Sequence, residues 1–193
     1  LTRVLRWAYE TNPQAHLVIN HFDATGPDYF NQLQGLINAG SPLSGSGIQM
    51  HMQTTNWDLA SVWWICERFA ALGLPIALTE LTVLSGESSF KAKGNPNWAT
   101  SSERWEGWPS TPEGEASQAD YAEKVYTLLF SHPAVERIVW WDFTDRGAWL
   151  GAPAGLLCGD MSPKPAYDRL RKLIHEDWRT EASGTTDASG AFS

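Results

Sequence analysis

The chain has 193 residues, of which 42% are apolar, so it is long enough to bury the core of one domain or of one large part of a domain. Its net charge of −8 and its 14 Lys and Arg residues argue against a nucleic-acid partner or an anionic membrane, because both need clustered positive charge. Of the 11 tryptophans we expect about half in the core, and the others are suited to stacking on sugar rings.

Four apolar runs of strand length recur along the chain, with helical patterns between them. In chain order, strands are expected at residues 15–22, 47–52, 75–81 and 137–143. Helices are expected at residues 1–11, 28–39, 58–72, 121–129 and 167–174, with Asn56 and Ser162 as candidate caps of the third and fifth. The apolarity of the strands is continuous instead of alternating, which is typical of parallel sheets that are covered on both faces.

The order of the elements, one helix followed by four strand and helix pairs, indicates parallel βα units. A complete (β/α)8 barrel usually needs about 250 residues. We therefore predict an α/β fold that forms the carboxyl-terminal half of a (β/α)8 TIM barrel, with four parallel strands alternating with helices. Such a half has two unpaired sheet edges, which leaves open dimerisation into a closed barrel, aggregation, or dependence on a missing half.

Polar residues stand near the carboxyl ends of the two middle strands, where parallel α/β folds place their chemistry. Glu80 lies at the end of the run 75–81, and a carboxylate there is costly unless it is paired. It could be a nucleophile, a general base, a metal ligand or a salt-bridged structural residue. Gln49 and His51 are two residues apart on one strand and therefore point to the same face. Together these residues indicate a polar active-site rim around Glu80.

An aromatic segment follows the last expected strand. Trp141 and Trp149 are candidates for a sugar platform, and Asp145 and Arg146 for a local ion pair; the alternative is two core tryptophans and a solvated turn. The long connection 82–110 directly follows Glu80, so we expect it to lie over the same rim.

These motifs resemble, in order and spacing, those of the glycoside hydrolase family 10 xylanases. The resemblance rests on Gln49-x-His51, Leu78-Thr79-Glu80-Leu81, the segment Trp141 to Trp149 with its internal Phe143-Thr144-Asp145, Pro163-Lys164-Pro165-Ala166-Tyr167, and the segment Asn20 to Asp23. It implies a partial catalytic domain at residues 1–178, with 179–193 as a linker or the start of a following module. It also implies hydrolysis of internal β-1,4 bonds of xylan with retention of configuration, without a cofactor or metal.

The resemblance implies a role for each candidate residue. Glu80 would be the nucleophile and His51 would orient it. The residues that bind the sugar next to the scissile bond would be Asn20, Gln49, Trp141 and Trp149. A retaining glycosidase also needs a protonated carboxyl about 5 to 5.5 Å from its nucleophile.

In the family the second carboxyl belongs to the Glu of an Asn-Glu pair on an earlier strand, and no Asn-Glu pair occurs in this sequence. We therefore expect the chain to carry the nucleophile half of the site and to lack the acid/base half. That half would belong to a missing amino-terminal part of the barrel, so the isolated chain would be inactive.

Three features depart from the family pattern. Thr82 stands where Asp is usual, residues 20–23 read Asn-His-Phe-Asp instead of Asn-Asp-Tyr-Asn, and Asp142 stands where Gly is common. They leave open a second function, in which the chain belongs to a barrel protein that binds carbohydrate without catalysis. A metal-dependent hydrolase that uses His21, Asp23, His51 and Glu80 is disfavoured because no paired His motif of ligand spacing occurs.

The sequence also bears on location and on cysteine chemistry. The resemblance implies a secreted or periplasmic protein, although the first residues do not read as a signal peptide. Cys66 and Cys158 are too few for a disulfide framework and are expected to be free thiols.

Overall fold

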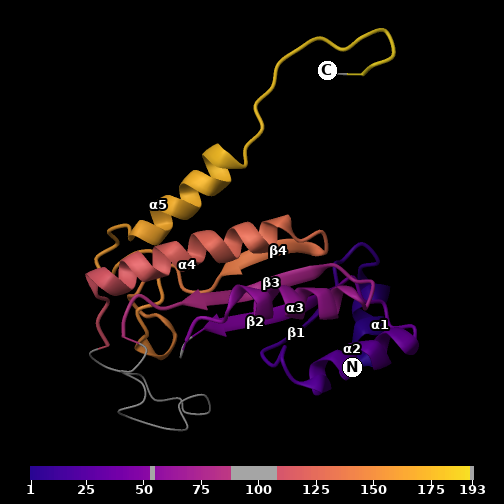
Figure 1. Ribbon diagram of the computed structural model, residues 1–193. Helices are drawn as coiled ribbons and strands as arrows, with labels where there is room; N and C mark the ends of the chain where they lie inside the picture. The colour runs from indigo at the N-terminus through magenta and orange to yellow at the C-terminus, as the bar shows by residue number, and fades with distance from the viewer. Residues whose placement is uncertain (53–54, 88–107, 192–193) are drawn as a thin grey trace.

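A computed structural model describes residues 1–52, 55–87 and 108–191 (Figure 1). One sheet contains four parallel strands in the order β1 (Val18–His21), β2 (Gly45–Met52), β3 (Ile76–Val83) and β4 (Val135–Trp140). The helices are α1 (Thr2–Thr11), α2 (Pro27–Asn38), α3 (Leu59–Ala70), α4 (Pro112–Ser131) and α5 (Pro165–Lys172). A 3-10 turn lies at Trp149–Gly151, and a π-helical turn at Leu173–Asp177 continues α5. The predicted alternation of parallel strands and helices is confirmed.

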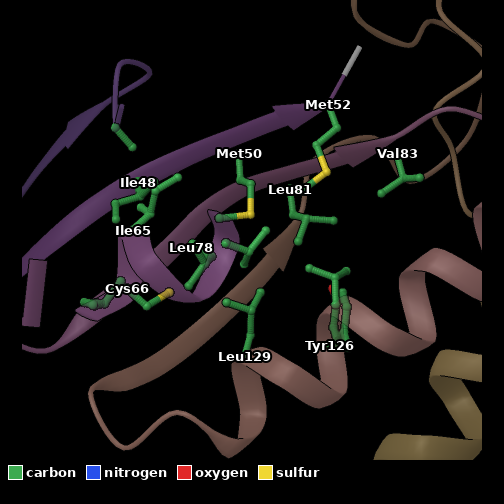
Figure 2. Packing of buried hydrophobic residues seen from close by; sticks show 14 of the residues in the cluster. Ile48, Met50, Met52, Ile65, Cys66, Leu78, Leu81, Val83, Tyr126 and Leu129 are labelled. Carbon is green, nitrogen blue, oxygen red and sulfur yellow. The ribbon is translucent and has the colours of Figure 1, made fainter. Parts of the chain in front are cut away.

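The core lies between one face of the sheet and the helices α3 and α4 (Figure 2). Ile48, Met50 and Met52 of β2 are buried there, and they alternate with the half-buried Gln49 and His51. Successive side chains of a strand point to opposite faces. Burial of the three apolar residues therefore places Gln49 and His51 together on the other face, as predicted.

The fourth strand is shorter than expected at its carboxyl end. β4 stops at Trp140, so residues 141–143 lie beyond it. Trp141 and Phe143 continue the apolar run in the sequence, but their side chains are 46% and 60% exposed, which means that the run does not mark a buried strand there.

Both predicted helix caps are wrong. Asp58 caps α3, because its Oδ1 accepts a hydrogen bond from the backbone N–H of Ser61 at 2.9 Å. The N-cap of α5 is Lys164, and Ser162 instead donates its hydroxyl to Asp160 in the preceding turn (2.6 Å). In both regions a nearby Asp offers the stronger acceptor and the local turn forms around it.

Four of the nine tryptophans in the described residues are buried or pack against the core, which agrees with the expectation of about half. Among the described residues only Trp108 is fully buried, while Trp57, Trp140 and Trp178 pack partly against the core. Cys66 and Cys158 are free, and burial raises the pKa of the Cys66 thiol to about 12. In the part of the chain that the structure describes, no helix is both long and apolar enough to cross a membrane.

Leu78 tests the contribution of the sheet to the core, because it is fully buried between the sheet and the helices. We expect Leu78→Ala to lower the free energy of unfolding by about 2 to 5 kcal/mol, through lost apolar burial and a residual cavity. Urea unfolding followed by circular dichroism measures this loss. Val139→Ala on β4 is the control, since Val139 is 39% exposed, and equal losses in the two variants would contradict the assignment of the core.

Candidate active site

A bulge in β3 turns Glu80 away from the core. The register pairs Ile48 with Leu78 and then Gln49 with Glu80, so that Thr79 is an extra residue in β3. In a regular strand Glu80 would share the face of Leu78, which is fully buried in the core. A bulge changes the direction of the following side chains. Glu80 therefore lies on the face of Gln49, and Leu81 takes the next core position.

The Glu80 carboxylate is held by two side chains from the two preceding strands, β1 and β2. Asn20 Nδ2 donates to Glu80 Oε1 at 3.0 Å, and His51 Nε2 lies 2.9 Å from Glu80 Oε2. Thr79 Oγ1 donates to Asn20 Oδ1 at 2.7 Å, which fixes the orientation of the Asn20 amide. The side chains of His51 and Glu80 are only 15% and 13% exposed. Three strands thus meet at one partly buried carboxylate.

Thr82 completes the surroundings of His51. Its Oγ1 lies 2.8 Å from His51 Nδ1, where the family pattern would place an Asp. An ionised Glu80 can only accept, so the Nε2 that faces it carries the proton, and Nδ1 of a neutral ring then accepts from the Thr82 hydroxyl. The hydroxyl therefore satisfies the ring and keeps its N–H directed at Glu80 without adding a second negative charge.

Two aromatic rings flank His51. The ring centroid of Trp149 lies 5.3 Å from that of His51, and the centroid of Trp141 lies 5.8 Å from it in an edge-on arrangement. Their exposed fractions are 42% and 46%, so the alternative of two core tryptophans does not hold. The two rings stand beside the carboxylate cluster with surface free to receive a flat ligand.

Asp142 lies between these two tryptophans in sequence. Its Oδ1 accepts a hydrogen bond from the backbone N–H of Trp149 at 3.1 Å, and its buried Oδ2 has no partner among the described residues. Burial raises the pKa of the Asp142 carboxyl, and the hydrogen bond from the Trp149 N–H acts in the opposite direction.

A buried ion pair anchors the loop that carries Trp149. Lys164 is fully buried, and its Nζ lies 2.7 Å from Asp145 Oδ1 and donates to Ser85 Oγ at 2.8 Å. Asp145 Oδ1 also accepts from the backbone N–H of Gly155 at 2.8 Å. The expected pair of Asp145 with Arg146 is wrong, because the buried Lys164 offers Asp145 a charge that is shielded from water. The signal in the sequence was a lone Lys between two prolines.

The structure brings together five of the six predicted site residues in direct contacts: Asn20, His51, Glu80, Trp141 and Trp149. The sixth, Gln49, is half-buried and lies opposite Glu80 in the register of β2 and β3. Of the connection 82–110, residues 88–107 with Trp98 and Trp105 lie outside the described part, so its expected place over the rim stays a prediction.

His21 and Asp23, the other members of the conceivable metal set, are engaged locally. The backbone N–H of Asp23 donates to His21 Nδ1 at 2.9 Å, and Asp23 Oδ1 accepts from the backbone N–H of Gly26 at 2.8 Å. Within residues 1–52, 55–87 and 108–191, no three His, Cys, Asp or Glu side chains gather in a way that could hold a metal ion.

The fold and the site together define a parallel α/β protein with a carboxylate at the end of a middle strand and tryptophans beside it. The family model of glycosyl hydrolase family 10 matches residues 1–173, so the chain belongs to this family. Its four parallel strands and their helices match part of the (β/α)8 barrel of family 10 xylanases.

Individual relatives agree with this assignment. The chain is 27% identical over 187 residues to endo-1,4-beta-xylanase B of Thermotoga neapolitana, with 91% of the chain and 48% of that protein covered. It matches the structure of xylanase 10B from Thermotoga petrophila in complex with xylobiose with a TM-score of 0.71 and 26% identity, covering 91% of the chain and 51% of that structure. It is also 28% identical over 188 residues to the anti-sigma-I factor RsgI6 of Acetivibrio thermocellus, covering 96% of the chain and 21% of that protein. The chain thus spans about half the length of the xylanases it matches.

The ion pair of Lys164 and Asp145 makes a prediction about stability. Lys164→Met should lower the free energy of unfolding by about 3 to 5 kcal/mol, because it leaves the 17%-exposed Asp145 carboxylate without its cation. Urea unfolding at neutral pH measures the loss.

The double variant Lys164→Met with Asp145→Leu is the matched test, since it removes both charges. It should recover a large part of the loss, and a double variant that is less stable than Lys164→Met alone would contradict the role of the ion pair.

Proposed function

We propose that the chain carries the nucleophile half of a retaining β-1,4-glycosidase that acts on internal bonds of xylan. The observation that carries the proposal is the Glu80 carboxylate, held by Asn20 and His51 at the carboxyl end of β3. Family membership supports the reaction class, and the xylanases among the relatives support xylan as the substrate. By the same resemblance, we propose that the protein acts outside the cytoplasm, as a secreted or periplasmic enzyme.

In this mechanism an oxygen of Glu80 attacks the anomeric carbon and forms a covalent glycosyl ester, which water then hydrolyses. Both Glu80 oxygens accept hydrogen bonds, so the carboxylate is oriented before substrate arrives. The N–H of His51 and the amide of Asn20 thus hold the two carboxylate oxygens in place for the attack. Trp141 and Trp149 would receive the face of the sugar beside the cluster, with Gln49 on the same side of the sheet.

The leaving oxygen needs a proton from a second carboxyl group. We propose that this acid comes from a front half of the barrel and is not among these 193 residues, because the sequence has no Asn-Glu pair. Its absence would make the isolated chain unable to cleave xylan, while leaving the nucleophile competent toward a substrate whose leaving group needs no protonation.

A second candidate function is carbohydrate binding without catalysis. It is favoured by Thr82 in place of the usual acid, and by the similarity to a protein named as an anti-sigma-I factor and not as a xylanase. The exposed tryptophans beside Glu80 would serve either function.

A trapping experiment separates these functions. We expect 2,4-dinitrophenyl 2-deoxy-2-fluoro-xylobioside to label the isolated chain covalently at Glu80, because dinitrophenolate leaves without an acid and the fluorine slows release of the sugar. Intact mass spectrometry and peptide mapping detect the adduct, and xylan incubated with the same chain should release no reducing sugar.

Glu80→Gln should abolish labelling, whereas Glu113→Gln, at an exposed position in the first turn of α4, should leave it unchanged. Labelling that persists in Glu80→Gln would refute the assignment of Glu80 as the nucleophile. Cleavage of xylan by the isolated chain would refute the proposal that the acid is missing from it. Sugar binding without any adduct would favour the second candidate, a non-catalytic carbohydrate-binding protein.

The aromatic platform is tested by binding. Trp141→Ala and Trp149→Ala should each weaken xylohexaose binding at least about tenfold, equivalent to about 1.4 kcal/mol, because each removes a face for stacking. Isothermal titration calorimetry measures the affinity. Trp64→Ala is the control, since this tryptophan on α3 is 56% exposed and contacts Arg68, and an equal effect there would argue against a platform at the strand ends.

A further inference from the structure

We propose that Asp142 is a positioning residue that holds Trp149 in its sugar-binding place beside His51, an inference that rests on the proposed function. Asp142 stands where Gly is common in the family pattern, and Gly has no side chain that could accept the hydrogen bond from the Trp149 N–H, which we call the latch. It would make sugar affinity depend on a side chain that does not itself touch the sugar.

The first step is the anchoring of Asp142 to the sheet. The preceding residue, Trp141, donates its backbone N–H to the carbonyl of Leu81 at 3.0 Å, so the backbone leaves β4 from a fixed point. From there Asp142 Oδ1 reaches across the loop to the backbone N–H of Trp149. Trp149 is therefore tied to the sheet that carries His51 and Glu80 by one side-chain hydrogen bond.

The second step is that the turn at Trp149 needs such a tie. Leu150 has φ of 58°, a left-handed conformation that is unfavourable for a residue with a side chain, and Leu150 is only 5% exposed. Strained backbone persists where surrounding contacts hold it. The hydrogen bond of Asp142 supports the turn at its start, and the ion pair of Lys164 with Asp145 supports the loop before it.

The third step is the charge of Asp142. Its Oδ2 is buried without a partner among the described residues, so ionisation places an unpaired charge next to the turn. The titratable groups around it are His51 on β2, which is bound to Glu80 on β3, and Asp145 on its own loop, which is bound to Lys164. Burial raises the pKa of Asp142, so the held conformation is favoured at low pH and is weakened as pH rises through that pKa.

The test is calorimetry with xylohexaose from about pH 4 to about pH 7, a range that spans an ordinary and a raised Asp pKa. In the wild-type chain we expect affinity to fall severalfold as pH rises. Asp142→Asn keeps an oxygen acceptor and cannot ionise, so it should bind at least as tightly as wild type at low pH and lose that part of the pH dependence. Asp142→Ala removes the acceptor and should bind more weakly, by about tenfold, at every pH.

A double-mutant cycle shows whether Asp142 acts through Trp149. Trp149→Ala with Asp142→Ala should bind no more weakly than Trp149→Ala alone, because the latch then has nothing to hold. Additive losses, or the same pH profile in wild type and Asp142→Asn, would overturn the inference.

Failure of the wild-type chain to bind xylohexaose would count against the proposed function and not against the latch. The latch is then decided by 19F NMR on protein labelled with 5-fluorotryptophan, in which Trp149→Phe assigns the signal. The Trp149 resonance should move with pH in wild type and stay in place in Asp142→Asn, and a pH response that is identical in both proteins would refute the latch.

Discussion

The site depends on the one-residue bulge at Thr79. The core requires Leu78 and Leu81 on the helix-covered face of β3, and their spacing of three cannot be met by a regular strand, in which alternate residues share a face. The bulge resolves this conflict and places Glu80 on the opposite face, level with Gln49. Thr79 donates hydrogen bonds to Asn20 of β1 and to the carbonyl of Ile48 of β2, so the irregular residue is itself held by the two preceding strands. One bulge in the strand pairing thus keeps Leu78 and Leu81 in the core and places the Glu80 carboxylate on the opposite face.

Much of this arrangement follows from the sequence, and the exceptions have physical causes. The spacing of two residues between Gln49 and His51 made it possible to place them on one face of β2, and the position of Glu80 at a strand end was visible from the apolar run before it. The side on which Glu80 lies was not visible, because bulges depend on the pairing with a neighbouring strand. The partner of Asp145 could not be predicted either, because Lys164 is distant in sequence and Lys is usually a surface residue. The resemblance to glycoside hydrolase family 10 supplied the roles of these residues, which the sequence pattern alone left open.

Thr82, which stands where the family pattern has an acid, holds His51 through a hydroxyl group. A hydroxyl can donate to one ring nitrogen and so fix the tautomer, whereas a carboxylate would also favour a charged ring. Of the two β3 side chains that contact His51, only Glu80 is consequently a carboxyl group, where the usual pattern would have two. This arrangement suits a nucleophile that has to stay ionised, and it also suits a neutral sugar receptor.

The buried ammonium of Lys164 joins segments that come from different βα units: Ser85 after β3, Asp145 after β4 and its own position at the start of α5. The ion pair therefore holds together the two ends of the segment from Asp145 to Lys164. Within this loop Leu150 and Leu157 are buried and fix its packing, whereas Trp149 is 42% exposed and can be exchanged with less effect on the fold. The exposed positions of the loop that carries Trp149 are thus places where ligand preference can change at little cost to the fold.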